Sequence, residues 1–71
     1  MSIAECNAIV PGNVARIIEK SGLKQNAVAE RAGFSKQAFS DMLNGRKIIK
    51  PCDVIAISDA LGVGVNELFI S

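Results

Sequence analysis

A glycine interrupts an amphipathic pattern in the middle of this 71-residue chain, in the stretch ERAGFSKQAFSDMLNG (residues 30–45). Apolar residues recur there every three or four positions, which is typical of one face of a helix. Glycine in a helix interior costs about 1 kcal/mol relative to alanine, and it readily adopts the left-handed conformation that ends helices. Gly33 therefore predicts a turn between two short helices rather than one long helix.

The same spacing continues along the chain and predicts an all-α, compact bundle of about five short helices. Their expected extents are from near Pro11 to Ser21-Gly22, from near Gln25 to Gly33, from Ser35 to Asn44-Gly45, from Pro51 to Gly62, and from about Val65 to Phe69. Proline suits the first turn of a helix, serine its N-cap, and glycine the position after its end. The apolar positions that define these helices are Val14, Ile17, Ile18, Val28, Ala29, Ala32, Phe39, Met42, Leu43, Val54, Ile55, Ile57, Leu61, Val65, Leu68 and Phe69.

The length allows one domain with one small core, which we place at residues 11–71. Residues 1–10 are either an extended arm or a short helix opened by a Ser2-x-x-Glu5 capping box. No apolar run approaches the ~20 residues that span a bilayer, and no basic signal-peptide start is present, so a cytoplasmic protein is expected. Cys6 and Cys52 are expected to be reduced and mostly buried, with a disulfide as the minor alternative. Without histidine, an ordinary zinc site is excluded, and no metal or cofactor is expected.

Charge is distributed unevenly along the chain. Residues 24–50 contain six cations against two acids, a net charge of +4, whereas the remainder carries −3. Such asymmetry indicates an anionic partner for one face, although a chance cluster of solvated lysines has the same appearance.

Two short helices joined by a tight glycine turn form a helix-turn-helix unit when they cross at a steep angle. Ala29 supplies the small residue for the close crossing, Gly33 the positive φ, and Phe34 an apolar plug after the turn. Phe39 and Met42 then face inward. This arrangement leaves four polar side chains outward, namely Lys36, Gln37, Ser40 and Asp41. An ordinary helical hairpin with a solvated face is the alternative.

The stretch QNAVAERAGFSKQAFSDMLNG (residues 25–45) resembles the signature of phage-repressor-like, XRE-type helix-turn-helix proteins, the Cro and lambda-repressor family. SGLKQ before it, and GRKIIKP and ISDALGVGVNEL after it, extend the resemblance over about Pro11 to Leu68. The resemblance implies a five-helix lambda-repressor-like domain that binds operator DNA as a homodimer and regulates transcription, most simply as a repressor in a bacterial or phage-type, nucleoid-associated setting. Lys24 and Gly64 depart from the family pattern, because both stand where a capping Ser or Thr is common.

In such proteins the N-terminal part of the recognition helix lies against base edges in the major groove. The expected base contacts are Lys36, Gln37, Ser40 and Asp41. Lysine donates to guanine, glutamine pairs with adenine, and aspartate accepts from cytosine. A salt bridge to a neighbouring cation is an equal alternative for Asp41. The expected phosphate contacts are Gln25, Ser35, Asn44, Arg46, Lys47 and Lys50, with solubility as the alternative role of the loop cations.

The apolar content exceeds what so small a domain buries, so a subunit interface is expected at the chain ends. The C-terminal candidates are Val65, Phe69 and Ile70, and the N-terminal ones are Ile3, Ile9 and Val10; alternatively, both ends fold over the core. The sequence offers no His, no nucleophile with a base and no paired carboxylates, which argues against an enzyme. The competing function is a protein-interaction module, such as an antitoxin or an antirepressor partner, that uses the same fold.

Overall fold

A computed structural model of the chain describes residues 3–70, which form four α-helices and one 3-10 helix. The elements are α1 (Ile3–Ser21), α2 (Gln25–Ala32), α3 (Lys36–Leu43), α4 (Pro51–Leu61) and η1 (Val65–Phe69). Residues 3–70 contain no strand, so the all-α prediction is confirmed. The fifth predicted helix is only a five-residue 3-10 helix.

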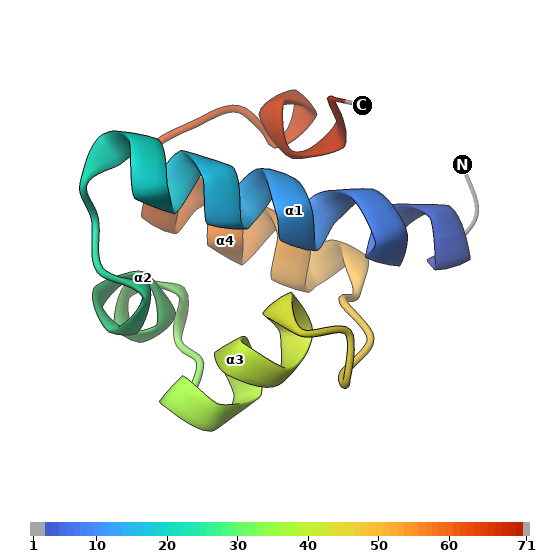
Figure 1. Cartoon of the computed structure of the whole chain (residues 1–71), viewed down its shortest axis with the longest axis horizontal. Helices are drawn as coiled ribbons and strands as arrows, with labels where there is room; N and C mark the ends of the chain where they lie inside the picture. Colours follow the sequence, from blue (N-terminus) through green and yellow to red (C-terminus); the bar gives the residue numbers. More distant parts are fainter. Residues whose placement is uncertain (1–2, 71) are drawn as a thin grey trace.

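Helix α1 runs the length of the molecule, and the other elements gather around it (Figure 1). In this view α4 lies behind α1, and α2 and α3 lie on the opposite side of α1 from η1. Helix α2 packs on α4, while η1 packs on both α1 and α4. The arrangement leaves α3 at one edge of the molecule and the C-terminal segment at the other.

One apolar core lies between these elements. Its buried members are Val10, Val14, Ile18, Val28, Ala29, Phe39, Met42, Ile49, Val54, Ile57, Ala60 and Leu68. Every helix contributes to it, which accounts for the three- and four-residue spacing in the sequence. No helix within residues 3–70 combines the length and the hydropathy needed to cross a membrane.

The first helix begins eight residues earlier than predicted, and Pro11 lies inside it. A proline inside a helix removes a hydrogen bond to the carbonyl of residue i−4 and costs about 3 kcal/mol or more. On both sides of Pro11, side-chain bonds tie α1 to other segments. Asn7 accepts a 2.7 Å bond from the amide of Ile49, and Asn13 donates a 2.8 Å bond to the carbonyl of Leu68. Residues 3–10 are thus helical and continuous with α1, while Ser2 lies outside the described residues.

The predicted burial of Cys52 on α4 is wrong. Cys52 is exposed and free, and Ile55 is 54% exposed. Helix α4 is apolar on nearly every side, so the pattern alone does not select its buried face. Val54, Ile57 and Ser58 form that face, and Cys52 and Ile55 lie outside it. The side chain of Cys6 lies outside the described part of the chain.

Candidate nucleic-acid interface

The turn at Gly33 joins α2 to α3. Gly33 has φ +85°, in the left-handed region that glycine enters without steric cost. Its amide donates to the carbonyl of Glu30 at 3.2 Å, and the amide of Phe34 donates to the carbonyl of Ala29 at 2.9 Å. These two bonds satisfy the last carbonyls of α2 and reverse the direction of the chain within a few residues. The predicted turn is confirmed.

Aromatic packing then fixes the orientation of α3. The rings of Phe34 and Phe39 are stacked, with centroids 6.1 Å apart and planes within 7°. Phe39 and Met42 are fully buried, while Phe34 is half-buried against the core. The inner face of α3 is therefore held by large side chains, and its opposite face is free for contacts.

That opposite face is polar. Ser35 is the N-cap of α3, and its Oγ accepts a 3.1 Å bond from the amide of Ala38. Because the cap uses only an acceptor lone pair of Ser35, its hydroxyl proton is still available to a phosphate. Lys36 and Gln37 are exposed in the first turn, and Ser40 and Asp41 are half-buried one turn later.

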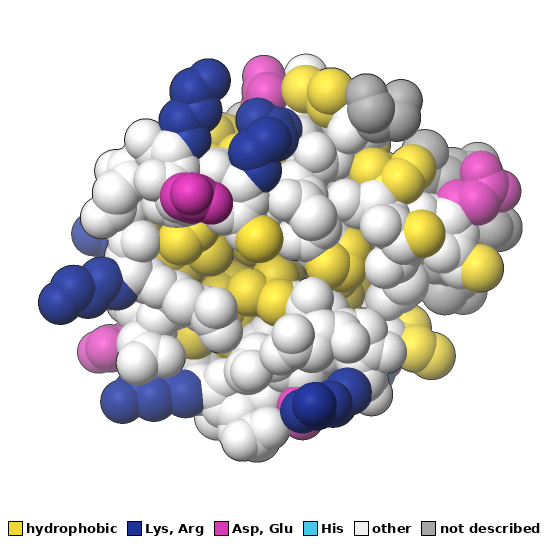
Figure 2. All heavy atoms as spheres, in the orientation of Figure 1, with side chains coloured by type: hydrophobic (Ala, Val, Ile, Leu, Met, Phe, Trp, Pro, Cys, Tyr) yellow, Lys and Arg dark blue, Asp and Glu magenta, His cyan; other side chains and the backbone are white. Residues whose placement is uncertain are grey.

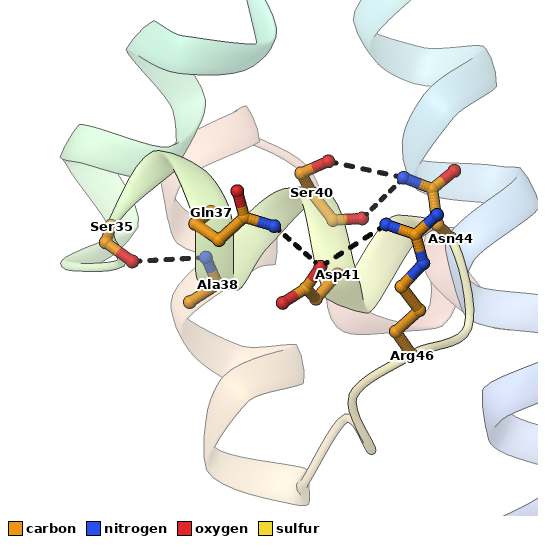
Figure 3. Close-up of polar contacts among 7 residues, drawn as sticks. All are labelled: Ser35, Gln37, Ala38, Ser40, Asp41, Asn44 and Arg46. Carbon is orange, nitrogen blue, oxygen red and sulfur yellow. Dashed lines mark hydrogen bonds and ion pairs between the residues drawn. The ribbon is translucent and has the colours of Figure 1, made fainter.

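The polar side chains of α3 bond to one another and to the following loop (Figure 3). Gln37 Nε2 donates to Asp41 Oδ1 at 2.9 Å, and Arg46 Nη1 lies 3.9 Å from the same oxygen. The side chain of Asn44 turns back on the helix and donates to the carbonyl and the hydroxyl of Ser40. Of the two roles considered for Asp41, the ion pair is therefore present within the chain. The Gln37–Asp41 bond was not predicted, although glutamine and aspartate four residues apart on a helix commonly bond.

The loop after α3 carries exposed cations at Arg46, Lys47 and Lys50. Asn7 of α1 holds this loop. Its Oδ1 accepts from the amide of Ile49 at 2.7 Å, and its Nδ2 reaches the carbonyl of Ile49 at 3.5 Å. Asn7 was not predicted as part of this region, because the first helix was expected to begin near Pro11. Extending the helical pattern back through Val10 would have put Asn7 on the same face as the core.

The space-filling view in Figure 2 shows Lys and Arg side chains along the edge of the molecule that α3 forms. Apolar side chains are visible between α1 and the α2–α3 pair. Gln25, the first residue of α2, is also exposed. Lys24 and Gly64 occupy the N-cap positions of α2 and η1 and make no side-chain cap bond, as the departures from the family pattern imply. The described residues bring together no group of three potential metal ligands.

The apolar candidates at the chain ends divide into two groups. Val65 is 40% exposed and Ile70 is 50% exposed, whereas Phe69 is half-buried against the core. Val10 is fully buried and belongs to the core, so its assignment to an interface is wrong. Ile9 is half-buried, and the side chain of Ile3 lies outside the described part.

A left-handed glycine turn between two short helices, with a buried inner face and a polar outer face, defines a helix-turn-helix domain. The family of helix-turn-helix domains matches residues 14–68 of the chain. A protein of Sinorhizobium fredii, "Uncharacterized HTH-type transcriptional regulator y4dJ", is 37% identical over 60 residues, which cover 84% of this chain and 78% of that protein. No solved structure matches the chain. The chain belongs to the XRE-type, phage-repressor-like helix-turn-helix family, a family of DNA-binding transcription regulators.

Proposed function

We propose that the chain binds operator DNA sequence-specifically as a homodimer and represses transcription, with α3 in the major groove. The observation that carries the proposal is the outer face of α3, where Lys36, Gln37 and Ser40 offer hydrogen-bonding groups rather than apolar ones. Such groups match the donor and acceptor pattern of base edges in the major groove.

Phosphate contacts set the register of the complex. We assign them to the exposed residues that flank α3, namely Gln25, Ser35, Asn44, Arg46, Lys47 and Lys50. Asn44 Nδ2 donates to both the carbonyl and the hydroxyl of Ser40 in the free protein, so its contact with a phosphate competes with these bonds. If each subunit neutralises about three phosphates, the dimer has a log–log salt slope of about −5.

Selection of bound duplexes from a random DNA pool tests the proposal. We expect a palindromic motif whose half-site centres are about 34 Å apart. Gln37→Ala should lose discrimination at one base pair in each half-site, by about 1–3 kcal/mol, and keep the rest of the motif. Salt-sensitive binding without any motif would contradict specific readout, and absence of binding at low salt would contradict DNA binding itself.

A second function is favoured by two exposed aliphatic side chains, one in the loop after α3 and one on α4. Ile48 is 62% exposed and Ile55 is 54% exposed, and neither belongs to the polar face. Exposed apolar side chains favour contact with another protein where they belong to one contiguous patch. A protein partner of the antitoxin or antirepressor kind is therefore the alternative, and it is compatible with DNA binding through α3.

A further inference from the structure

The hydrogen bond between Gln37 and Asp41 fixes which way the glutamine amide faces. The two residues are one turn apart on α3, and Gln37 Nε2 lies 2.9 Å from Asp41 Oδ1 (Figure 3). A carboxylate only accepts hydrogen bonds, so the NH₂ group, and not the carbonyl, must face Asp41. The carbonyl oxygen of Gln37 points away from Asp41.

This polarity matters for base readout. A glutamine amide reads adenine with one acceptor and one donor, because its carbonyl accepts from N6 and its NH₂ donates to N7. With one N–H given to Asp41, Gln37 keeps one N–H and its carbonyl, which is what adenine requires. Guanine presents two acceptors, O6 and N7. A glutamine whose second N–H is already used cannot donate to both.

Asp41 is itself held at the junction of α3 and the basic loop. Its side chain is only 29% exposed, and Arg46 Nη1 lies 3.9 Å from Oδ1. Its backbone carbonyl accepts from the amides of Arg46 and Lys47 at 2.8 and 3.2 Å. These backbone bonds are independent of the carboxylate, so a substitution at position 41 can remove the acceptor while the loop stays attached.

We infer that Asp41 is a positioning residue that orients Gln37 for adenine and against guanine, rather than a residue that reads a base itself. This inference rests on the proposed function, since it requires α3 to lie in the major groove. Donating to both guanine acceptors requires Gln37 to leave Asp41 and be ordered anew, whereas binding adenine does not. At about 0.5–1.5 kcal/mol for ordering one such side chain, Asp41 should contribute about 2- to 12-fold to the preference for adenine over guanine.

The test compares binding to the selected operator with binding to a duplex in which guanine replaces the adenine read by Gln37. The variants are Asp41→Ala, Asp41→Asn, Gln37→Ala, the double variant Gln37→Ala/Asp41→Ala, and Asp59→Asn. Asp59 is exposed on α4 and controls for the removal of one negative charge. Asn at position 41 can either accept from the NH₂ group of Gln37 or donate to its carbonyl, so it keeps a partner without fixing the direction, whereas Ala keeps no partner.

We expect Gln37→Ala to lose about 5- to 150-fold of the discrimination and Asp41→Ala about 2- to 12-fold, at the same base pair. Asp41→Asn should lose preference as Asp41→Ala does, because an amide at position 41 no longer requires Gln37 to donate, and Asp59→Asn should lose none. In the Gln37→Ala background, Asp41→Ala should have no further effect on the preference, because its role passes through Gln37.

Three results would overturn the inference alone while the motif and its dependence on Gln37 persist. The first is an unchanged adenine preference in Asp41→Ala. The second is a loss in Asp59→Asn equal to that in Asp41→Ala, which would assign the effect to the removal of one negative charge. The third is a change at a different base pair that survives in the Gln37→Ala background, which would make Asp41 a direct reader. If the unaltered protein selects no motif, the proposed function fails and the inference fails with it.

Discussion

Two glycines that are equally open to a larger side chain should respond oppositely to alanine. A Cβ atom at either Gly12 or Gly33 would meet nothing within 4 Å. Steric clashes with neighbouring groups therefore do not distinguish the two positions, and only the backbone conformation does. Gly33→Ala forces alanine into the left-handed region and should destabilise by about 1–2 kcal/mol. Gly12→Ala lies inside α1 at negative φ and should stabilise by about 0.5–1 kcal/mol. Urea denaturation followed by circular dichroism measures both, and shifts of the same sign would contradict this assignment.

The structural roles of single residues were predictable where one backbone conformation or one hydrogen bond dominates. Gly33 and Ser35 illustrate this, because a left-handed turn and a side-chain cap are local requirements that tertiary contacts seldom override. Cys52 and Ile55 were not predictable in the same way. On a helix that is apolar on nearly all sides, the buried face is chosen by the neighbouring helices, which the local pattern does not encode.

At the scale of elements, the placement of η1 depends on one buried amide. Asn13 Nδ2 donates to the carbonyls of Leu68 and Ile70 at 2.8 and 2.7 Å, across more than 50 residues of sequence. Asn13→Ala removes both donors and leaves these carbonyls without that partner, so we expect a loss of about 1–3 kcal/mol. Hydrogen exchange should show faster opening at residues 65–70 than in α3. Asn66→Ala, at an exposed position of η1, is the matched control and should stay within about ±0.5 kcal/mol.

The boundaries of the helices were harder to predict than the presence of the helices. The helices of the motif follow from their own caps and turns, and their positions agree with the prediction. The start of α1 differs from the prediction: the helix includes Pro11, and Asn7 and Asn13 on either side of it bond to distant segments. The last element is likewise a 3-10 helix, and its N-cap residue Gly64 makes no side-chain cap bond.

For the whole molecule, size and charge both bear on assembly. The domain measures 28 × 21 × 18 Å, so one copy does not reach two successive major grooves about 34 Å apart. The positive segment, residues 24–50, includes α3 and the loop after it, while α4 and η1 contribute Asp53, Asp59 and Glu67. Because η1 lies across α1 from α3, contact between two copies through η1 leaves both α3 helices free for DNA.

That geometry leads to a prediction about Ile70, which is 50% exposed next to η1. If two copies meet there, Ile70→Asp places two carboxylates in an apolar contact and should shift the dimer towards monomer, while the free energy of unfolding of the monomer changes by no more than about 0.5 kcal/mol. Sedimentation equilibrium reports the shift, and operator binding should weaken in parallel. Ile55→Asp is the matched control, because Ile55 is 54% exposed on α4 and outside the proposed interface. If Ile55→Asp dissociates the dimer and Ile70→Asp does not, the interface lies on α4 instead. The distance between the two α3 helices on DNA would then differ from the one that contact through η1 gives.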